Sequence, residues 1–316
     1  MSVQILILSS LYDFSTDLVC QALERKGASY LRLNKESFSD YRLTLDFNEI
    51  VLEVEIAGNR YLVTQNVRSI YYRQPVFLRN TPGEAISVKD QLSRSQWMGF
   101  LRSLMVFDRA CWINRPDATY SAETKAYQLK IAKDIGFQIP ETIVGNDVKQ
   151  FKKIGVTAVI KSLDTVLLMD GEDCLFTYST VSNVHSISDQ EVKEAPLTVQ
   201  EYIYPKIDIR VTVIGDAIYA VRITSDGRGI EDDWRTTNRE KLEYTDIRLP
   251  DYIEDMCRLL VYKLGLEFGA IDLILRENEY VFIEINPTGE WGWLVDDHRR
   301  IDHEIANFLM GSSDAA

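Results

Sequence analysis

Apolar residues recur with two different periods along this chain of 316 residues, the helical period in some segments and the alternation of a strand in others. Near the start, an apolar segment at 3–8 is followed by a helical pattern and then by an alternating segment at 29–34. Strand, helix and strand in this order predict a βαβ unit and a parallel sheet. Alternating segments between 42 and 64 predict an antiparallel meander, with Gly58 and Asn59 as one hairpin turn.

The middle of the chain predicts a second unit. A helical pattern from Ala122 to Ile135 ends at Gly136, a residue typical of a helix C-terminus. Strands are expected at 155–163 and 174–180, with a flexible connection between them.

The last part predicts a third unit, built from two hairpins and two helices. Gly215 and Asp216 separate two apolar strands in the first hairpin. We therefore predict an α/β (α+β) fold with three units, at 1–116, 117–200 and 201–316.

The strand of the second hairpin carries an unusual polar face. Its sequence VFIEINP, at 281–287, alternates with the period of a strand. The expected core face consists of Val281, Ile283 and Ile285. The opposite face then carries Glu284 and Asn286, a carboxylate and an amide side by side.

The facing strand adds a second carboxylate. Asp272 lies out of phase with its apolar neighbours, and a three-residue turn at 277–279 would set it opposite Glu284. Asp272, Glu284 and Asn286 then share one face. Oxygen donors without His or Cys suit Mg²⁺ or Mn²⁺, completed by water and phosphate oxygens. For either carboxylate alone, a solvated sheet face is the plainer interpretation.

Several other polar residues could contact a nucleotide. Lys161 ends a strand without the glycines of a P-loop, and Lys125 stands on the preceding helix. The stretch VQEYI could form a hinge where backbone groups and Glu201 meet an adenine. Asp208 and Arg210 share one strand face, so they could take a ribose hydroxyl and a phosphate.

One more arginine stands in a polar loop. Arg235, in DDWRTTN, is a further candidate contact for a phosphate or an acyl phosphate. Surface ion pairs and idle surface cations are the plain alternatives for all of these residues.

The composition of the chain limits the kinds of binding partner and the compartment that we expect. The net charge is −13, which argues against general affinity for nucleic acid or an anionic membrane. The four cysteines are scattered without a C-x-x-C pair, as in a reducing compartment. The start lacks a signal-peptide pattern and no apolar run reaches membrane-spanning length, so a cytoplasmic protein is expected.

The order of these motifs resembles the ATP-grasp superfamily over nearly the whole chain. The matching stretches are SAETKAYQL, VIKSL, VQEYI, DIRV and the D…EIN set. The resemblance implies an N-terminal pre-ATP-grasp domain, a central domain and a C-terminal domain that clamp ATP between two sheets. It implies these contacts: Lys125 and Lys161 to phosphates, Glu201, Tyr202 and Ile203 to adenine, Asp208 to ribose, and Asp272, Glu284 and Asn286 to two Mg²⁺.

Three stretches further resemble the microviridin-type (graspetide) peptide maturases. They are ILILSSLYDFSTDLV, YYRQP and EINPTGEWGWL. This resemblance implies a homodimer that recognises the leader of a ribosomal precursor peptide. It also implies activation of Asp or Glu side chains of the core as acyl phosphates, and closure of ω-ester or ω-amide bonds.

Two other functions stay open at this point. The ribosomal-protein glutamate ligases share the nucleotide and metal motifs, so the chain could add amino acids to a carboxylate. It could also bind nucleotide without catalysis. For a ligase, we expect Lys161, Arg210 and Arg235 to stabilise the acyl phosphate, and the region at 162–174 with Gly171 to close as a lid. Trp291 and Trp293 could line a peptide site or simply pack.

Overall fold

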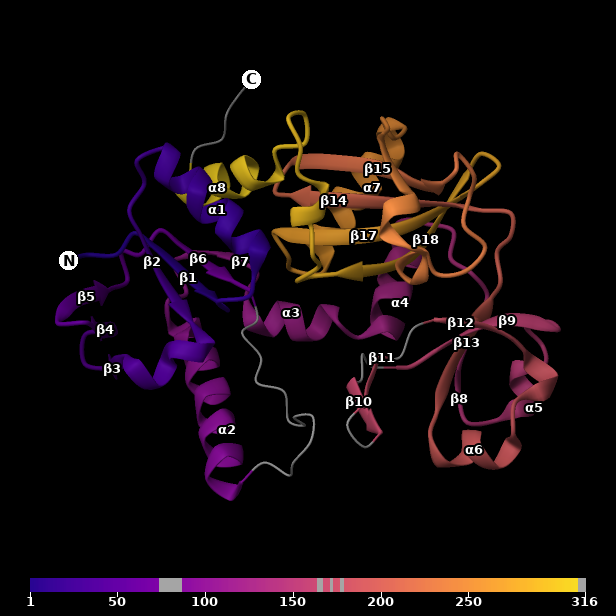
Figure 1. Ribbon diagram of the computed structural model, residues 1–316, viewed down its shortest axis with the longest axis horizontal. Coiled ribbons are helices and arrows are strands. Elements are labelled where there is room, and N and C mark those ends of the chain that lie inside the picture. Colours follow the sequence, from indigo (N-terminus) through magenta and orange to yellow (C-terminus); the bar gives the residue numbers. More distant parts are fainter. Residues whose placement is uncertain (74–86, 164–166, 171–172, 177–178, 312–316) are drawn as a thin grey trace.

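The computed structural model describes residues 1–73, 87–163, 167–170, 173–176 and 179–311. Figure 1 shows an N-terminal unit at one end, a large C-terminal sheet beside it, and a smaller central sheet below that sheet. The mixture of parallel and antiparallel sheets with helices confirms the predicted α/β (α+β) class.

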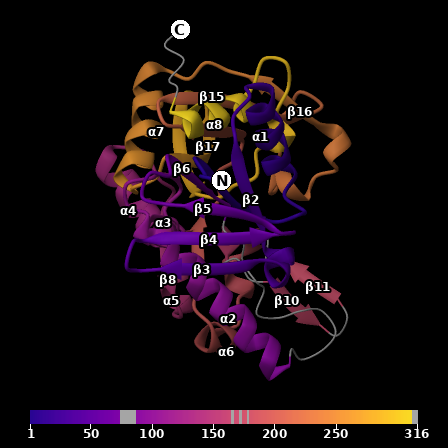
Figure 2. The same ribbon diagram turned by 90° about the vertical axis from the view of Figure 1, so that its left-hand side faces the viewer.

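The N-terminal unit contains the predicted βαβ arrangement. Its parallel sheet has the order β2-β1-β6-β7, and the meander β3-β4-β5 packs against the same core, as seen end-on in Figure 2. The elements are β1 (Ile5–Ser9), α1 (Phe14–Arg25), β2 (Tyr30–Asn34), β3 (Arg42–Asp46), β4 (Val51–Ile56), β5 (Asn59–Val63), β6 (Ser69–Tyr72), α2 (Val88–Ser103) and β7 (Cys111–Ile113).

The turn of the meander lies one residue earlier than predicted. Ile56 pairs with Asn59, so the turn residues are Ala57 and Gly58. Both have positive φ angles, 48° and 78°, as a tight turn between twisted strands requires. Asn59 therefore already belongs to the strand.

The central unit is a small antiparallel sheet with the order β12-β9-β13-β8 and a separate hairpin, β10-β11. The strand predicted at 174–180 is divided between β11 and β12. The connection predicted as flexible contributes β10, whereas Gly171 lies outside the described residues. The elements are β8 (Thr142–Gly145), α5 (Val148–Phe151), β9 (Thr157–Lys161), β10 (Leu167–Asp170), β11 (Asp173–Phe176), β12 (Thr180–Asn183), α6 (Asp189–Glu194) and β13 (Leu197–Glu201).

The C-terminal unit is an antiparallel sheet with the order β16-β15-β14-β17-β18. The predicted turn at Gly215 and Asp216 is confirmed, because Ile214 pairs with Ala217. The elements are β14 (Ile207–Ile214), β15 (Ala217–Ser225), β16 (Leu242–Asp246), α7 (Asp251–Lys263), β17 (Phe268–Arg276), β18 (Glu279–Asn286) and α8 (Ile301–Met310).

The helix predicted from Ala122 to Ile135 begins later, at Lys125, and Ala122 is the last residue of a separate, preceding helix. α3 (Pro116–Ala122) ends before α4 (Lys125–Ile135), and Gly136 ends α4 with a φ of 111°, as predicted. α4 and α7 cover one face of the C-terminal sheet and share its core. The other face packs against α1 and α8 in one part and carries the site in another.

Side chains from distant parts of the chain join the N-terminal and C-terminal units. α8 packs against α1, and one apolar core contains residues of β1, α1, β17 and α8. Within the described ranges, no helix is long and apolar enough to cross a membrane.

Candidate active site

The hairpin β17–β18 brings Asp272 opposite Glu284, but not in the way that the sequence suggested. Arg276 pairs with Glu279, so the turn has two residues rather than three. A β-bulge then restores the register, because Leu273 pairs with Phe282 and Asp272 pairs with Glu284. Ile283 is the extra residue of β18.

The bulge also corrects the predicted faces of β18. Phe282 and Ile285 belong to the core under α4 and α7, whereas Val281 and Ile283 face the opposite side with Ile203 and Ile274. The predicted core face of Val281, Ile283 and Ile285 is therefore wrong. An extra residue changes which side chains point to which face, since side chains alternate along a strand.

Arg210 and Asp272 form a buried ion pair on the site face. Nη1 of Arg210 donates to Oδ1 of Asp272 at 2.7 Å, across the paired strands β14 and β17. Burial raises the pKa of the Asp272 carboxyl, although Arg210 and Arg235 oppose that effect. An ion pair in such a place depends on both partners, because either one alone would be a buried, unpaired charge.

Glu284 lies among three cations. Nζ of Lys125 donates to it at 3.1 Å and Nη1 of Arg235 at 3.2 Å. Burial disfavours the charged carboxylate, yet Lys125, Arg235 and Lys161 hold the pKa of Glu284 well below its usual range. Asn286 completes the predicted set, as its Nδ2 donates to Glu284 at 3.5 Å. The structure thus brings Asp272, Glu284 and Asn286 together on one face.

The donor set fits a hard cation. Among the described residues, none donates a hydrogen bond to Oδ2 of Asp272, although this oxygen is buried. A buried carboxylate oxygen without a donor is a natural ligand for Mg²⁺. The described residues include no cluster of three or more His, Cys, Asp or Glu with metal-binding geometry, so an amide and bound phosphates would have to complete the coordination.

A pocket lies between the central and C-terminal sheets, directly beside this set. Its walls come from β9, the 200–203 segment, β14, β17, β18 and the loop at 231–235. The predicted contacts among its lining residues are Lys161, Glu201, Tyr202, Ile203, Asp208, Arg235 and Asp272.

Several of these lining residues have a shifted pKa, Lys161 and Asp208 among them. Lys161 ends β9 as predicted, and burial lowers the pKa of its amine. Burial raises the pKa of Asp208 to about 6, even though Lys206 lies 2.5 Å away. A pocket edge where charged groups are partly desolvated is typical of a functional site.

Structural comparison identifies this architecture. The chain aligns with a Chryseobacterium gregarium RiPP-associated ATP-grasp ligase at a TM-score of 0.84 and 26% identity, covering 98% of this chain and 97% of that one. The chain has the ATP-grasp fold. The matching ligase was solved with ADP and with a leader and core peptide. Both the predicted fold and the predicted resemblance to ATP-grasp peptide ligases are confirmed.

Two other ATP-grasp structures support this assignment of the fold. The macrocyclase MdnC of Microcystis aeruginosa, solved with the precursor peptide MdnA, matches at a TM-score of 0.82 and 22% identity, over 99% of this chain and 100% of that one. A RimK domain protein from Sphaerobacter thermophilus matches less well, at 0.58 and 14%, over 98% and 100%. No protein-family model and no curated protein sequence matches the chain.

Sequence reasoning missed several polar residues around the ATP-grasp pocket. Lys206 pairs with Asp208, and Asp233 accepts from Arg235 at 2.9 Å. Gln128 of α4 donates to the backbone oxygen of Ile285 and accepts from its nitrogen, so it holds β18 in place. Lys206 could have been suspected from its distance of two residues from Asp208, but nothing near Gln128 in sequence signals its role.

A second missed group connects the N-terminal unit to the segment after Asn286. Arg73, the arginine of YYRQP, is almost fully buried and donates to Asp13, to the Thr288 oxygen and to Glu290. Asp13 is the N-cap of α1. This group therefore fixes the segment that follows the proposed metal ligands.

The two tryptophans have different surroundings. Trp291 is fully buried in the core shared by α1 and α8. Trp293 is half-buried and packs against Trp234 and Tyr244, with ring centroids 5.5 and 4.8 Å apart. Packing accounts for Trp291, whereas Trp293 stabilises the loop that carries Arg235.

Proposed function

We propose that this chain is an ATP-dependent ligase that activates Asp or Glu side chains of a ribosomal precursor peptide and joins them to other side chains of that peptide. The observation that carries the proposal is the hairpin face of Asp272, Glu284 and Asn286. This face borders a pocket between two sheets, and three cations surround Glu284. The match to a RiPP-associated ATP-grasp ligase over nearly the full length of both chains supports it. An ADP-forming ligase is the corresponding reaction class.

The nucleotide would lie in the pocket between the sheets. Glu201 and the backbone of Tyr202 and Ile203 would hold the adenine, and Asp208 the ribose. Lys125 and Lys161 would contact the phosphates. Apolar walls with a few fixed polar groups are the usual composition of such a site.

Asp272, Glu284 and Asn286 would hold Mg²⁺, as two ions, with Mn²⁺ as an alternative. Oxygen-only ligation supports this assignment, as does Oδ2 of Asp272, which accepts no hydrogen bond from the residues that the structure describes. Bound Mg²⁺ would offset the negative charge of the ATP phosphates.

The chemistry is the conversion of a carboxylate into a better acylating group. An oxygen of the peptide carboxylate attacks the γ-phosphorus of ATP, ADP leaves, and an acyl phosphate forms. Lys161, Arg210 and Arg235 stabilise its negative charge. A hydroxyl or amine of the same peptide then attacks the carbonyl carbon, loses its proton and releases inorganic phosphate.

The finer features of the graspetide maturases belong to the same proposal. They are recognition of a leader, ω-ester or ω-amide products, and a homodimer, and MdnC solved with its precursor supports the first. The division at 1–116, 117–200 and 201–316 is proposed on the same basis, whereas the expected lid at 162–174 lies partly outside the described residues.

Mass spectrometry tests the proposal directly. The chain is incubated with ATP, Mg²⁺ and precursor peptides encoded by neighbouring open reading frames. We expect the peptide to lose the mass of one water for each bond formed, with ADP as the second product. Added glutamate mass would instead identify a tailing ligase of the RimK type. Tight ATP binding without any change in peptide mass would indicate a binding protein.

A further inference from the structure

The loop between β1 and α1 exposes three large apolar side chains. Leu11 is 53% exposed, Tyr12 86% and Phe14 60%. We call these three residues the apolar loop surface. Exposed apolar residues are ordinary when scattered, but a group within four positions of one loop is typical of a binding site.

The loop is held firmly by polar contacts from beneath. Glu36 accepts from the Leu11 nitrogen at 2.9 Å and from Oγ of Ser10 at 2.6 Å. Arg32 donates to the Ser10 oxygen at 2.7 Å, and Asp13 caps α1. The loop therefore presents its apolar side chains without a large loss of freedom on binding, which favours affinity.

The loop lies at the functional edge of the N-terminal sheet. It follows the carboxyl end of β1, where the parallel strands β2, β1 and β6 also end. Ligands of open parallel sheets bind outside the carboxyl ends of the strands. Figure 1 shows α1, which begins at this loop, beside the C-terminal segments of the chain.

Several contacts connect the loop to the candidate active site. A Cβ added to Gly292 would lie 3.0 Å from the Phe14 ring, so the ring lies against this backbone. Oγ of Ser15 donates to Glu290 at 2.7 Å, and the Glu290 backbone oxygen accepts from Arg210 at 3.4 Å. Arg210 pairs with Asp272, so a series of contacts leads from the start of α1, next to the apolar loop surface, to the candidate active site.

We propose that the apolar loop surface binds the part of the substrate peptide that flanks the reacting Asp or Glu. The acid reaches the cations, and an apolar or aromatic residue a few positions away packs on Leu11, Tyr12 and Phe14. This inference rests on the proposed ligase function. We expect the bound segment to be an extended peptide. The cations of the site lie at one end and the apolar loop surface at the other, and a strand-like segment can contact both.

Peptide selection tests this surface. A library of short synthetic peptides, each with one Glu and varied neighbours, is bound to the full-length protein in the presence of ADP and Mg²⁺. We expect the bound fraction to be enriched in an apolar residue at a fixed distance from Glu. Tyr12→Ser and Leu11→Ser should each lower the affinity for an enriched peptide by about tenfold, since each removes apolar contact area. Phe14→Ser serves as a third variant.

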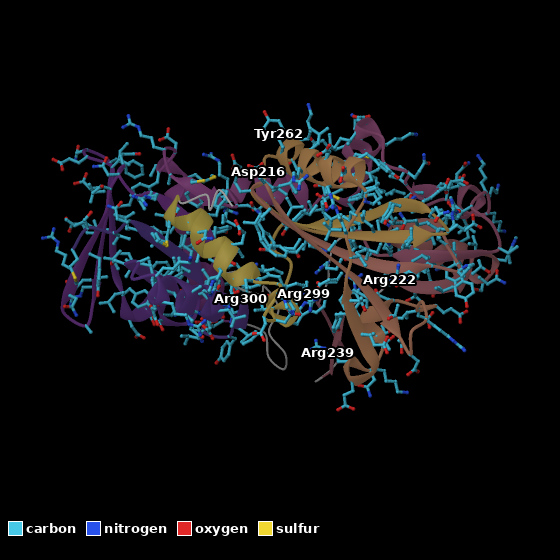
Figure 3. All side chains as sticks on the ribbon, turned by 90° about the horizontal axis from the view of Figure 1, so that it is seen from above. Asp216, Arg222, Arg239, Tyr262, Arg299 and Arg300 are labelled. Carbon is cyan, nitrogen blue, oxygen red and sulfur yellow. The ribbon has the colours of Figure 1, made fainter. Side chains whose placement is uncertain are left out.

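Matched controls remove exposed tyrosines from the other side of the C-terminal sheet. Tyr252 and Tyr262 lie on α7, 59% and 75% exposed, and Figure 3 shows Tyr262 at the outer edge. Tyr252→Ser and Tyr262→Ser should leave peptide affinity unchanged. All variants should keep the wild-type unfolding temperature and ADP affinity.

The outcomes separate this inference from the proposed function. Equal peptide affinity in the wild type and in the Tyr12→Ser and Leu11→Ser variants would contradict peptide binding by the apolar loop surface, even if ligation proceeds. A library without apolar enrichment would also overturn it. An enriched sequence is then placed in a precursor peptide with its leader and a Ser, Thr or Lys nucleophile. Binding through the surface without loss of water in the presence of ATP would overturn the ligase function and leave the surface standing.

Discussion

At the scale of single residues, the site is organised around Glu284. Lys125 and Arg235 donate to its carboxylate, and Lys161 lowers its pKa as well. Three cations around one carboxylate keep it ionised, and their amino and guanidinium groups are donors that suit a polyphosphate. The sequence singled out Lys161 at a strand end, Lys125 on a helix and Arg235 in a polar loop, but it could not show that they converge on Glu284.

The first prediction concerns the proposed metal ligands. Glu284→Gln or Asp272→Asn should lower ATP-dependent ligation at least about 100-fold while the protein still unfolds cooperatively, since an amide is a weaker cation ligand than a carboxylate. Ligation is measured by peptide mass and folding by thermal unfolding.

Glu279→Gln is the control, because Glu279 lies on the same hairpin, is exposed and forms an ion pair with Arg276, away from the site. It should keep wild-type activity. Full activity of Glu284→Gln at limiting Mg²⁺ would contradict the metal assignment.

The second prediction uses the ionisation of Asp208. Its pKa of about 6 lies above the ordinary value of 3.8, because burial disfavours the charged form. The ionised carboxylate accepts from ribose hydroxyls, so adenosine affinity should fall as the pH falls through 6, by up to about tenfold per pH unit. Calorimetry with adenosine avoids titration of the phosphates.

The Asp208→Asn variant gives the comparison. Its adenosine affinity should not change between about pH 5 and about pH 8, since the amide does not titrate. The same pH profile in the variant as in the wild type would show that another group is responsible.

At the scale of elements, the β-bulge at Ile283 decides which side chains reach the site. The alternating pattern of β18 predicted the strand and its pairing with β17, and both are present. It could not reveal the bulge, because Ile283 is apolar and fits either face. The division between α3 and α4 was missed for a similar reason, since Glu123 and Thr124 carry no Gly or Pro signal.

The third prediction follows from this bulge. Deleting Ile283 leaves a regular two-residue hairpin in which Asp272 still pairs with Glu284, so the fold should survive with a loss of about 2 kcal/mol or less. Nucleotide affinity should fall, because Ile283 lines the pocket. Denaturant unfolding and ADP binding measure the two effects.

Deletion of Ile285 is the matched control. It should prevent folding, because it shifts Asn286 to the core face in the place of Ile285, which is 1% exposed. If both deletions abolish folding alike, the assignment of Ile283 as the extra residue is contradicted.

At the scale of the whole molecule, Asn114 joins the N-terminal unit to the C-terminal sheet. Its amide donates to the backbone oxygens of Phe268 and Pro287, and its oxygen accepts from the nitrogens of Glu267 and Phe268. Asn114 is 1% exposed. A single buried side chain thus fixes both ends of the hairpin that carries the site.

The fourth prediction is that Asn114→Asp destabilises the protein, although the new side chain has nearly the same shape as the old one. Two backbone oxygens lose their donor and face a carboxylate, which should cost at least about 2 kcal/mol. Asn66→Asp, at an exposed position, is the control. Equal unfolding free energies for the two variants would contradict this role of Asn114.

The most direct test of the central claim follows the oxygen atoms of the substrate carboxylate. A precursor peptide with ¹⁸O-labelled Asp and Glu carboxylates is incubated with the chain, ATP and Mg²⁺, and the released phosphate is analysed by mass spectrometry. If the carboxylate attacks the γ-phosphorus, one ¹⁸O atom appears in phosphate for every bond formed. Bond formation with unlabelled phosphate would contradict activation through an acyl phosphate at this site.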